Sequence, residues 1–147
     1  MHVDFFYAEP LDRRDVKAIR KLIPELSGGR ESFGEREIAA TAADHVVFVA
    51  RTERGVGKIV GMCVVVPASK FGRKKIFVED VIVAEKFRGF GIGRAIMDKV
   101  IWYTKATGCY CVDLTTRPKN EAANKLYQSL GFKIRETNCY RRIIESD

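Results

Sequence analysis

The chain has 147 residues, of which 46% are hydrophobic and 31% are charged, and it carries a net charge of +7. This length predicts one domain, residues 1–147, and the composition excludes a disordered or fibrous protein. No apolar run approaches the roughly 18 residues that a membrane-spanning helix needs. Asp4 and Glu9 stand where a signal peptide would be basic or apolar, so we expect a cytoplasmic protein that does not bind membranes.

The excess of basic residues raises the question of nucleic-acid binding. These residues are spread along the chain without a zinc finger, a helix-turn-helix signature or a basic aromatic surface. A positive field suits an anionic cofactor equally well, so we expect no nucleic-acid partner. The four cysteines have neither C-x-x-C nor histidine spacing for zinc, and we expect reduced thiols and no metal.

The N-terminal third is typical of a strand followed by two helices. The strand covers 3–7, and an amphipathic helix begins at Asp12 and meets stop signals at Pro24 and at Gly28. A second helix is expected from 35 to 43, after a loop rich in glycine and serine.

A β-hairpin is predicted next, because the apolar segments 45–51 and 58–66 flank a glycine-containing turn. Pro67 is expected to end the second strand. Residues 68–75 include four basic side chains and are expected to form a solvated loop, with contact to a cofactor phosphate as the alternative.

The middle of the chain predicts a strand, a glycine-rich turn and a helix. Residues 76–83 are dense in β-branched and aromatic side chains, and apolar residues recur at helical spacing from Ile96 to Thr104. The first N–H groups of such a helix have no partner and carry its positive dipole end, so they favour a phosphate. Glycines let the backbone approach an anion closely, and two arginines add charge. The loop residues are Arg88, Gly89, Phe90, Gly91, Ile92, Gly93 and Arg94.

Two common phosphate-binding motifs do not match this turn. A dinucleotide-binding G-x-G-x-x-G would need glycine where Arg94 stands, and a P-loop would need a lysine after the glycines. The remaining pattern is R-x-x-G-x-G.

The C-terminal part predicts a strand over 109–115, a helix from Asn120 capped by Gly131, and a final hairpin that pairs 132–136 with 138–144. The two predicted strands around the central helix form a parallel pair through a right-handed crossover, and hairpins make the rest antiparallel. The fold class is therefore α/β, with a mixed, mostly antiparallel sheet and flanking helices.

Two motifs resemble the GNAT superfamily of acyl-CoA-dependent N-acetyltransferases. R-x-x-G-x-G after Val-Glu-Asp-Val-Ile-Val resembles the coenzyme A loop of that family, and its VED stretch looks like the diamine and polyamine branch. Residues 120–132 resemble the last conserved helix of the family, N-x-x-A-x-x-x-Y-x-x-x-G-F. The resemblance implies the GNAT fold, in which the parallel strand pair splays apart around the pantetheine arm.

The same resemblance implies acetyl-CoA as the acetyl donor. The glycine loop from Gly89 to Arg94 would bind the pyrophosphate, and Asn120 would hydrogen-bond the pantetheine arm. Asn124 is a further candidate for cofactor contact. Backbone groups of Val81, Ile82 and Val83 would pair with the pantetheine amides.

Glu79 is the candidate general base, because a carboxylate in an apolar strand has a raised pKa and an alkylammonium must lose a proton before it attacks. Asp80 is the rival, since strand alternation would put the two carboxylates on opposite faces. By resemblance Tyr127 is the general acid that protonates the leaving thiolate. The structural alternatives are a carboxylate paired with an arginine for Glu79 and a core aromatic for Tyr127.

The predicted activity is transfer of an acetyl group to a primary amine by direct attack in a ternary complex. The amine, a small molecule or a peptide, is left open by the sequence, as is the oligomeric state, for which a homodimer is one option. The alternative function is a catalytically inactive acyl-CoA-binding module of the same fold.

Overall fold

The computed structural model describes residues 2–7, 11–29, 32–53 and 57–144. Its five strands form one sheet in the order β1-β2-β3-β4-β5, which is antiparallel except for the parallel pair β4 and β5. The elements are β1 (His2–Tyr7), α1 (Arg13–Ser27), α2 (Glu35–Asp44), β2 (Val46–Arg51), β3 (Ile59–Lys70), β4 (Arg73–Val83), the short 3-10 helix η1 (Glu85–Phe87), α3 (Ile92–Ala106), β5 (Val112–Leu114) and α4 (Glu121–Ser129). The predicted mixed α/β sheet is confirmed.

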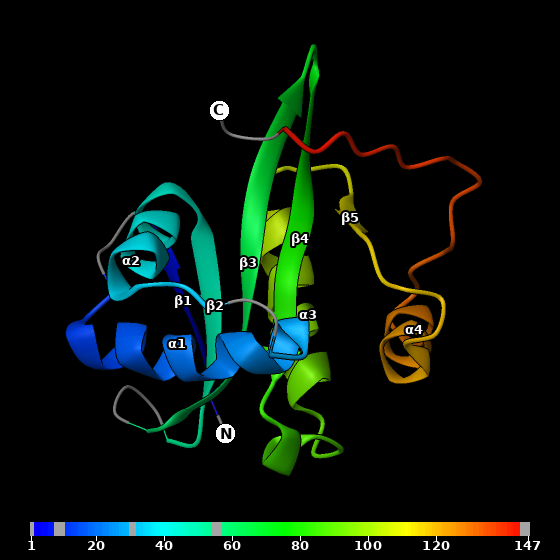
Figure 1. Cartoon of the computed structure of the whole chain (residues 1–147). Coiled ribbons are helices and arrows are strands. Elements are labelled where there is room, and N and C mark those ends of the chain that lie inside the picture. The colour runs from blue at the N-terminus through cyan, green and yellow to red at the C-terminus, as the bar shows by residue number, and fades with distance from the viewer. Residues whose placement is uncertain (1, 8–10, 30–31, 54–56, 145–147) are drawn as a thin grey trace.

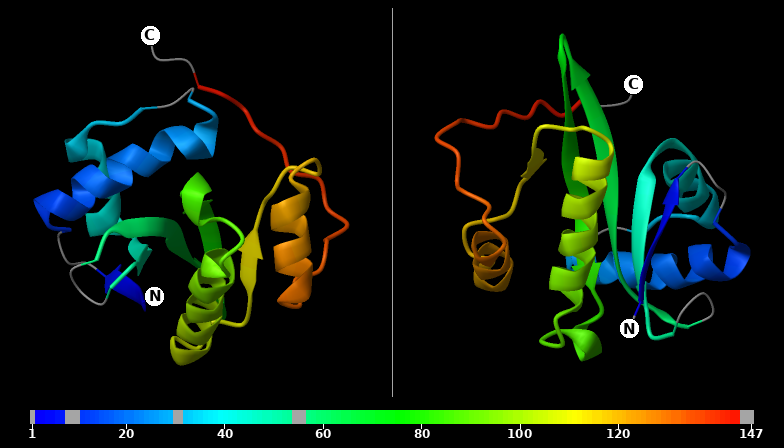
Figure 2. Two further views of the ribbon diagram at one scale, coloured as in Figure 1. Left: turned by 90° about the horizontal axis from the view of Figure 1, so that it is seen from below. Right: turned by 180° about the vertical axis from the view of Figure 1, so that it is seen from behind.

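Helices cover both faces of the sheet (Figure 1). Seen from below, α1 and α2 lie on one side of the strands and α3 lies on the other (Figure 2). Each layer has its own core, since alternate residues of the central strands point to opposite faces. Ile19, Ile38 and Val64 belong to the core under α1 and α2, whereas Cys63, Ile96 and Tyr127 belong to the core under α3 and α4.

α1 continues through Pro24, contrary to the prediction that this proline helps to end it. The helix ends at Ser27, and Gly28 follows in the left-handed conformation (φ 65°) and donates its N–H to the Pro24 carbonyl. Gly28 therefore is the stop signal that acts here. None of the helices in the described ranges is long and apolar enough to cross a bilayer.

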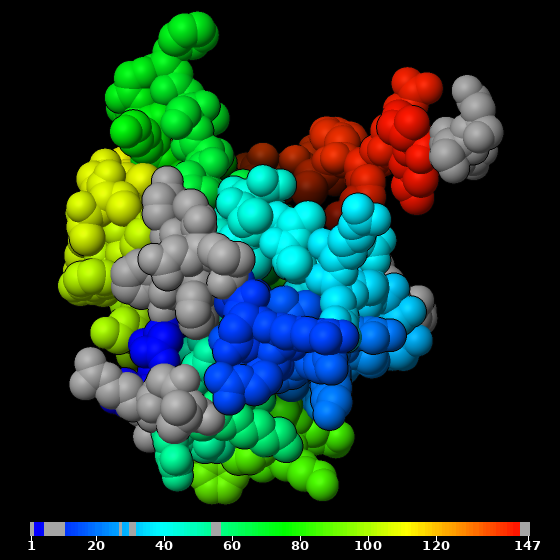
Figure 3. Space-filling model, turned by 90° about the vertical axis from the view of Figure 1, so that its left-hand side faces the viewer, coloured from blue at the N-terminus to red at the C-terminus, as the bar shows by residue number. Residues whose placement is uncertain are grey.

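β3 and β4 form a long hairpin whose tip projects beyond α2 (Figure 3). The prediction that Pro67 ends β3 and that 68–75 form a loop is wrong. Pairing with β2 stops at Val65, and beyond that point no described strand pairs with this edge of β3, so a missing N–H there costs no ladder hydrogen bond. Pro67 lies opposite Ile76, and the turn consists of Phe71 and Gly72, whose φ is 73°.

The C-terminal region differs most from the prediction. β5 covers only Val112–Leu114, where we expected a strand over 109–115. The expected final hairpin is wrong, because residues 132–144 contain no strand and run as an extended segment past β5 toward the upper part of β4 (Figure 1). An ion pair of 3.4 Å between Arg135 and Asp113 joins this segment to β5.

Candidate active site

A β-bulge in β4 brings two carboxylates to the same face of the sheet. Glu79 lies opposite Val64, a core residue under α1 and α2. The register then shifts between Met62 and Val64, and Asp80 takes a φ of 51°. Asp80 consequently lines a pocket on that same face, so the expectation that strand alternation would separate Glu79 and Asp80 is wrong.

The pKa of Glu79 is raised. Partial burial is the main cause, and the negative charge of Asp80 adds to it. The positive charge of Arg141, from the C-terminal segment, acts in the opposite direction. Glu79 thus binds a proton more readily than an ordinary glutamate, as a general base for an amine should.

The pocket lies between α1, α2 and the sheet and has a volume of about 320 Å³. Its described walls are mostly apolar, and the polar side chains among them are those of Glu37, Thr41 and Asp80. Leu26 at the end of α1 and Phe33 ahead of α2 complete its rim and are partly exposed (37% and 41%). The sequence did not point to Glu37 or Thr41, because only the packing of α2 on the sheet brings them here.

The glycine turn begins the 15-residue helix α3. Gly89 and Gly91 have φ angles of 82° and 77°, which glycine adopts without strain, and Gly91 is the N-cap and offers no side chain to the free N–H groups. The first turn of α3 contains no acidic residue. These features fit an anionic group such as a pyrophosphate. Phe90 is 74% exposed, while the Ile92 side chain is buried and leaves only its backbone for a ligand.

Both arginines of the turn have partners within the chain. Arg88 donates to the carbonyl oxygen of Val83 at 2.9 Å and to the Glu25 carboxylate of α1 at 3.3 Å. Arg94 donates to the Ser129 hydroxyl at 2.6 Å. Glu25 also accepts the N–H of Glu85 at 2.8 Å, so it ties the start of η1 to α1. The sequence did not identify Glu25, which lies 63 residues from Arg88.

The parallel pairing of β4 with β5 covers only a short segment. Ile76, Phe77 and Val78 pair with Val112, Asp113 and Leu114, and the pairing ends there. β4 continues to Val83, so its backbone from 79 to 83 has no β5 partner within the described residues. Val81 and Val83 lie beside the core under α3 and α4, and Ile82 belongs to the core under α1 and α2. This unpaired edge can accept an extended ligand.

Tyr127 is buried in the core under α3 and α4, with its ring 5.8 Å from that of Phe132. Burial raises its pKa, and Cys63 contributes further, so the hydroxyl keeps its proton at neutral pH. The hydroxyl makes no hydrogen bond to any described residue. Every fully buried side-chain oxygen of the described residues has a hydrogen-bond partner. The Tyr127 hydroxyl has none among these residues, so its oxygen must reach solvent.

α4 packs against the start of α3. A Cβ on Gly93 would lie 3.1 Å from Cδ2 of Leu126, so glycine permits this close approach. Asn120 caps α4 by accepting the N–H of Ala123 at 3.3 Å, and the Asn124 amide donates to carbonyl oxygens, including that of Asn120 at 2.8 Å. Both asparagines thus have structural partners at the end of α4 away from the glycine turn.

Comparison with known proteins agrees with this geometry. Glucosamine 6-phosphate N-acetyltransferase 1 of Oryza sativa subsp. japonica is 30% identical over 133 residues, which cover 84% of this chain and 78% of that protein. A putative acetyltransferase from Agrobacterium tumefaciens has a TM-score of 0.78 at 26% identity and covers 97% of this chain and 100% of its own.

A third similarity concerns the fold alone. The structure of AAC(6')-Iy in complex with the bisubstrate analogue CoA-S-monomethyl-acetylneamine has a TM-score of 0.71 at 22% identity, over 98% of this chain and 99% of its own.

The model of the acetyltransferase (GNAT) family matches residues 14–132. The chain therefore belongs to the GNAT family of acetyltransferases.

Proposed function

We propose that this protein transfers the acetyl group of acetyl-CoA to a primary amine in a ternary complex, with Glu79 as general base and Tyr127 as general acid. The observation that carries the proposal is the bulge in β4. It puts Glu79 and Asp80 beside an apolar pocket on one face, next to a strand edge that β5 leaves unpaired. An acceptor and an extended donor can meet at such an edge.

In this proposal Glu79 removes a proton from the ammonium group of the acceptor. The amine nitrogen forms a bond to the thioester carbonyl carbon, and a β4 backbone N–H holds the oxygen that becomes negative. The carbon–sulfur bond then breaks, and the electron pair stays on sulfur. Tyr127 donates its hydroxyl proton to that thiolate, which yields the free thiol and a tyrosinate. The nitrogen still carries two hydrogens after it has bonded to the carbonyl carbon, and one of these protons passes through solvent to the tyrosinate, which yields the amide and restores Tyr127.

The two groups approach the reacting atoms from different sides. Glu79 stands on the face covered by α1 and α2, while Tyr127 belongs to the core under α3 and α4. This supports separate roles, since one group must serve the acceptor and the other the donor. The glycine turn and its arginines would bind the pyrophosphate, and the β4 backbone at Val81 and Val83 would bind the pantetheine arm. For Asn120 and Asn124 contact with the donor remains a prediction.

A thiol-release assay with acetyl-CoA and a panel of primary amines tests the activity. We expect amine-dependent release of free thiol, with strong loss in Glu79→Gln and Tyr127→Phe and unchanged calorimetric affinity for coenzyme A. Tight coenzyme binding without turnover on any amine would instead support an acyl-CoA-binding module.

A further inference from the structure

Given the transferase function proposed above, we propose that the acceptor is a small primary amine carried on an aromatic or branched aliphatic group. That group enters the pocket between α1, α2 and the sheet. This goes beyond the primary amine of the proposed function. It also separates the protein from a relative that is named for glucosamine 6-phosphate, a strongly polar and anionic acceptor.

The walls of the pocket set the polarity of what it can take. Eleven of the fourteen described lining residues are apolar. Nine of them come from α1, α2 and three strands, and Leu11 and Phe33 lie just ahead of α1 and α2. A sugar buried here would lose its hydrogen bonds to water and find few replacements, which costs several kcal/mol for each unsatisfied group. An apolar group loses nothing comparable and gains from leaving water.

The charges at the pocket have the wrong sign for a phosphate. Of the described residues, Glu37 and Asp80 are the ionisable ones that line it, and no lysine or arginine does so. Arg13 and Arg20, on the outer side of α1, lie within 4.0 Å of Glu35 rather than in the pocket. Among the described lining residues a phosphate would meet two carboxylates and no cation.

The start of α2 could in principle bind an anion at its free N–H groups. Here the Glu37 carboxylate already accepts the N–H of Gly34 at 2.6 Å, so the chain supplies its own anion at this helix start. Glu35 adds a second carboxylate in the same helical turn. Both features disfavour a phosphate at the helix end nearest to the pocket.

The carboxylates suit the amine end of the acceptor. Asp80 lines the pocket and its neighbour Glu79 lies on the same face, so an ammonium group would be attracted to the place where Glu79 can deprotonate it. The charge of Arg141 lowers the pKa of Glu79, but Arg141 is not a lining residue of the pocket.

The volume of the pocket limits the size of the apolar group. About 320 Å³ lies at the lower end of the range for ligand pockets, roughly 300–1,000 Å³, so the apolar group must be small.

The test compares 2-phenylethylamine with glucosamine 6-phosphate as acceptors of the full-length protein. We expect kcat/KM for 2-phenylethylamine to exceed that for the sugar phosphate by at least about 10-fold. Phe33→Ala, which removes one apolar rim side chain, should raise KM for 2-phenylethylamine by about 10-fold and leave kcat within about twofold. Phe71→Ala removes the fully exposed phenyl ring at the hairpin tip and serves as the matched control, with no change expected.

Equal or better use of glucosamine 6-phosphate would overturn the inference and leave the transferase function standing. Unchanged KM in Phe33→Ala would also count against it. A calorimetric titration of each amine into the complex with coenzyme A separates binding from chemistry. If 2-phenylethylamine binds, glucosamine 6-phosphate does not bind and no turnover occurs, the result would support this acceptor class and refute the transferase function. If neither amine binds and no turnover occurs, both would be overturned.

Discussion

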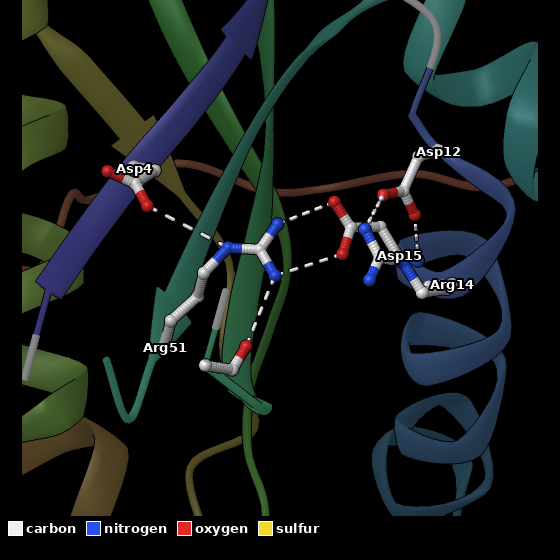
Figure 4. Close-up of polar contacts among 6 residues, drawn as sticks. Asp4, Asp12, Arg14, Asp15 and Arg51 are labelled. Atoms are coloured by element: carbon white, nitrogen blue, oxygen red, sulfur yellow. Dashed lines mark hydrogen bonds and ion pairs between the residues drawn. The ribbon is translucent and has the colours of Figure 1, made fainter. Parts of the chain in front are cut away.

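Asp15 on α1 and Arg51 at the end of β2 form a buried ion pair with two hydrogen bonds (Figure 4). Arg51 donates to one Asp15 oxygen at 2.9 Å and to the Gly57 carbonyl at 3.3 Å, and its Nε lies 3.7 Å from Asp4. The hydrogen bond to Asp15 is the main cause that raises the pKa of Arg51. One guanidinium group thus joins α1, β1 and the turn after β2, and it holds α1 as a wall of the pocket.

Asp15→Ala should lower the free energy of unfolding by about 3–5 kcal/mol, because it leaves a buried guanidinium without its main partner. Urea denaturation followed by circular dichroism measures this. Asp98→Ala, on the exposed side of α3, is the control and should cost far less. The double variant Asp15→Leu/Arg51→Met should be more stable than Asp15→Ala. Equal stability of Asp15→Ala and Asp98→Ala would show that the pair contributes little.

Glu79→Gln should lower kcat by about 10²-fold or more and leave coenzyme affinity unchanged, because it removes a proton acceptor but keeps the shape. The wild-type rate should fall as pH drops through the raised pKa of Glu79, because a protonated carboxyl group cannot act as a base. The difference in rate between the wild type and Glu79→Gln should therefore be largest above that pKa. Asp80→Asn is the matched comparison. A larger loss in Asp80→Asn, with little in Glu79→Gln, would transfer the role of base to Asp80.

The same pKa shift makes a prediction about stability. A glutamate whose pKa is raised in the folded state favours folding when it is protonated, and this advantage is lost as pH rises through the folded-state pKa. Glu79→Gln should therefore be at least as stable as the wild type at pH 7. The difference should vanish below the unfolded pKa, about 4.3. Melting curves at both pH values measure it, and a clear destabilisation at pH 7 would show that Glu79 makes a stabilising contact as an anion.

Gly91→Val should weaken coenzyme binding strongly. Gly91 has a φ of 77°, and a Cβ there would meet no atom within 4 Å, so valine would strain the backbone without clashing with the protein. Gly72→Val is a close control, because Gly72 has a φ of 73° and equal space at the hairpin tip. Both variants should lose about 1–2 kcal/mol of stability, whereas only Gly91→Val should change the calorimetric affinity for coenzyme A. Equal affinities would remove the glycine turn from the donor site.

Tyr127→Phe separates proton donation from packing. The ring and its contact with Phe132 remain, and the hydroxyl has no hydrogen-bond partner among the described residues, so stability should stay within about 1 kcal/mol. Turnover should fall by about 10²-fold or more. Tyr127→Ala should in addition cost about 3–5 kcal/mol of stability through the cavity it leaves. Near wild-type turnover in Tyr127→Phe would mean that water or another group protonates the thiolate.

Several features follow from the sequence alone because they depend on residues close together in the chain. The stop of α1 at Gly28, the start of α3 after Gly91 and the turn at Gly131 all use positive φ, which glycine adopts freely. The helix containing Tyr127 and the order of strands follow from local periodicity and turn residues. The family motifs are equally local, since the R-x-x-G-x-G turn surrounds the start of one helix.

Other features were decided only by contacts between distant segments. Whether Pro67 can lie in a strand depends on where β2 stops, and no local pattern reports that. Residues 132–144 have strand-like composition, yet strands form only where a neighbouring edge accepts them.

The site shows the same division. Glu79 could be identified as a carboxylate in an apolar strand, but its placement beside Asp80 comes from a register shift against β3. The pocket likewise takes its described lining from α1, α2, the residues just ahead of these helices and three strands. The sequence by itself determined the local turns, the helices and the motifs, because these depend on backbone angles and near neighbours. The tertiary structure decided register, edge pairing and pocket polarity, because these depend on which distant surfaces pack together.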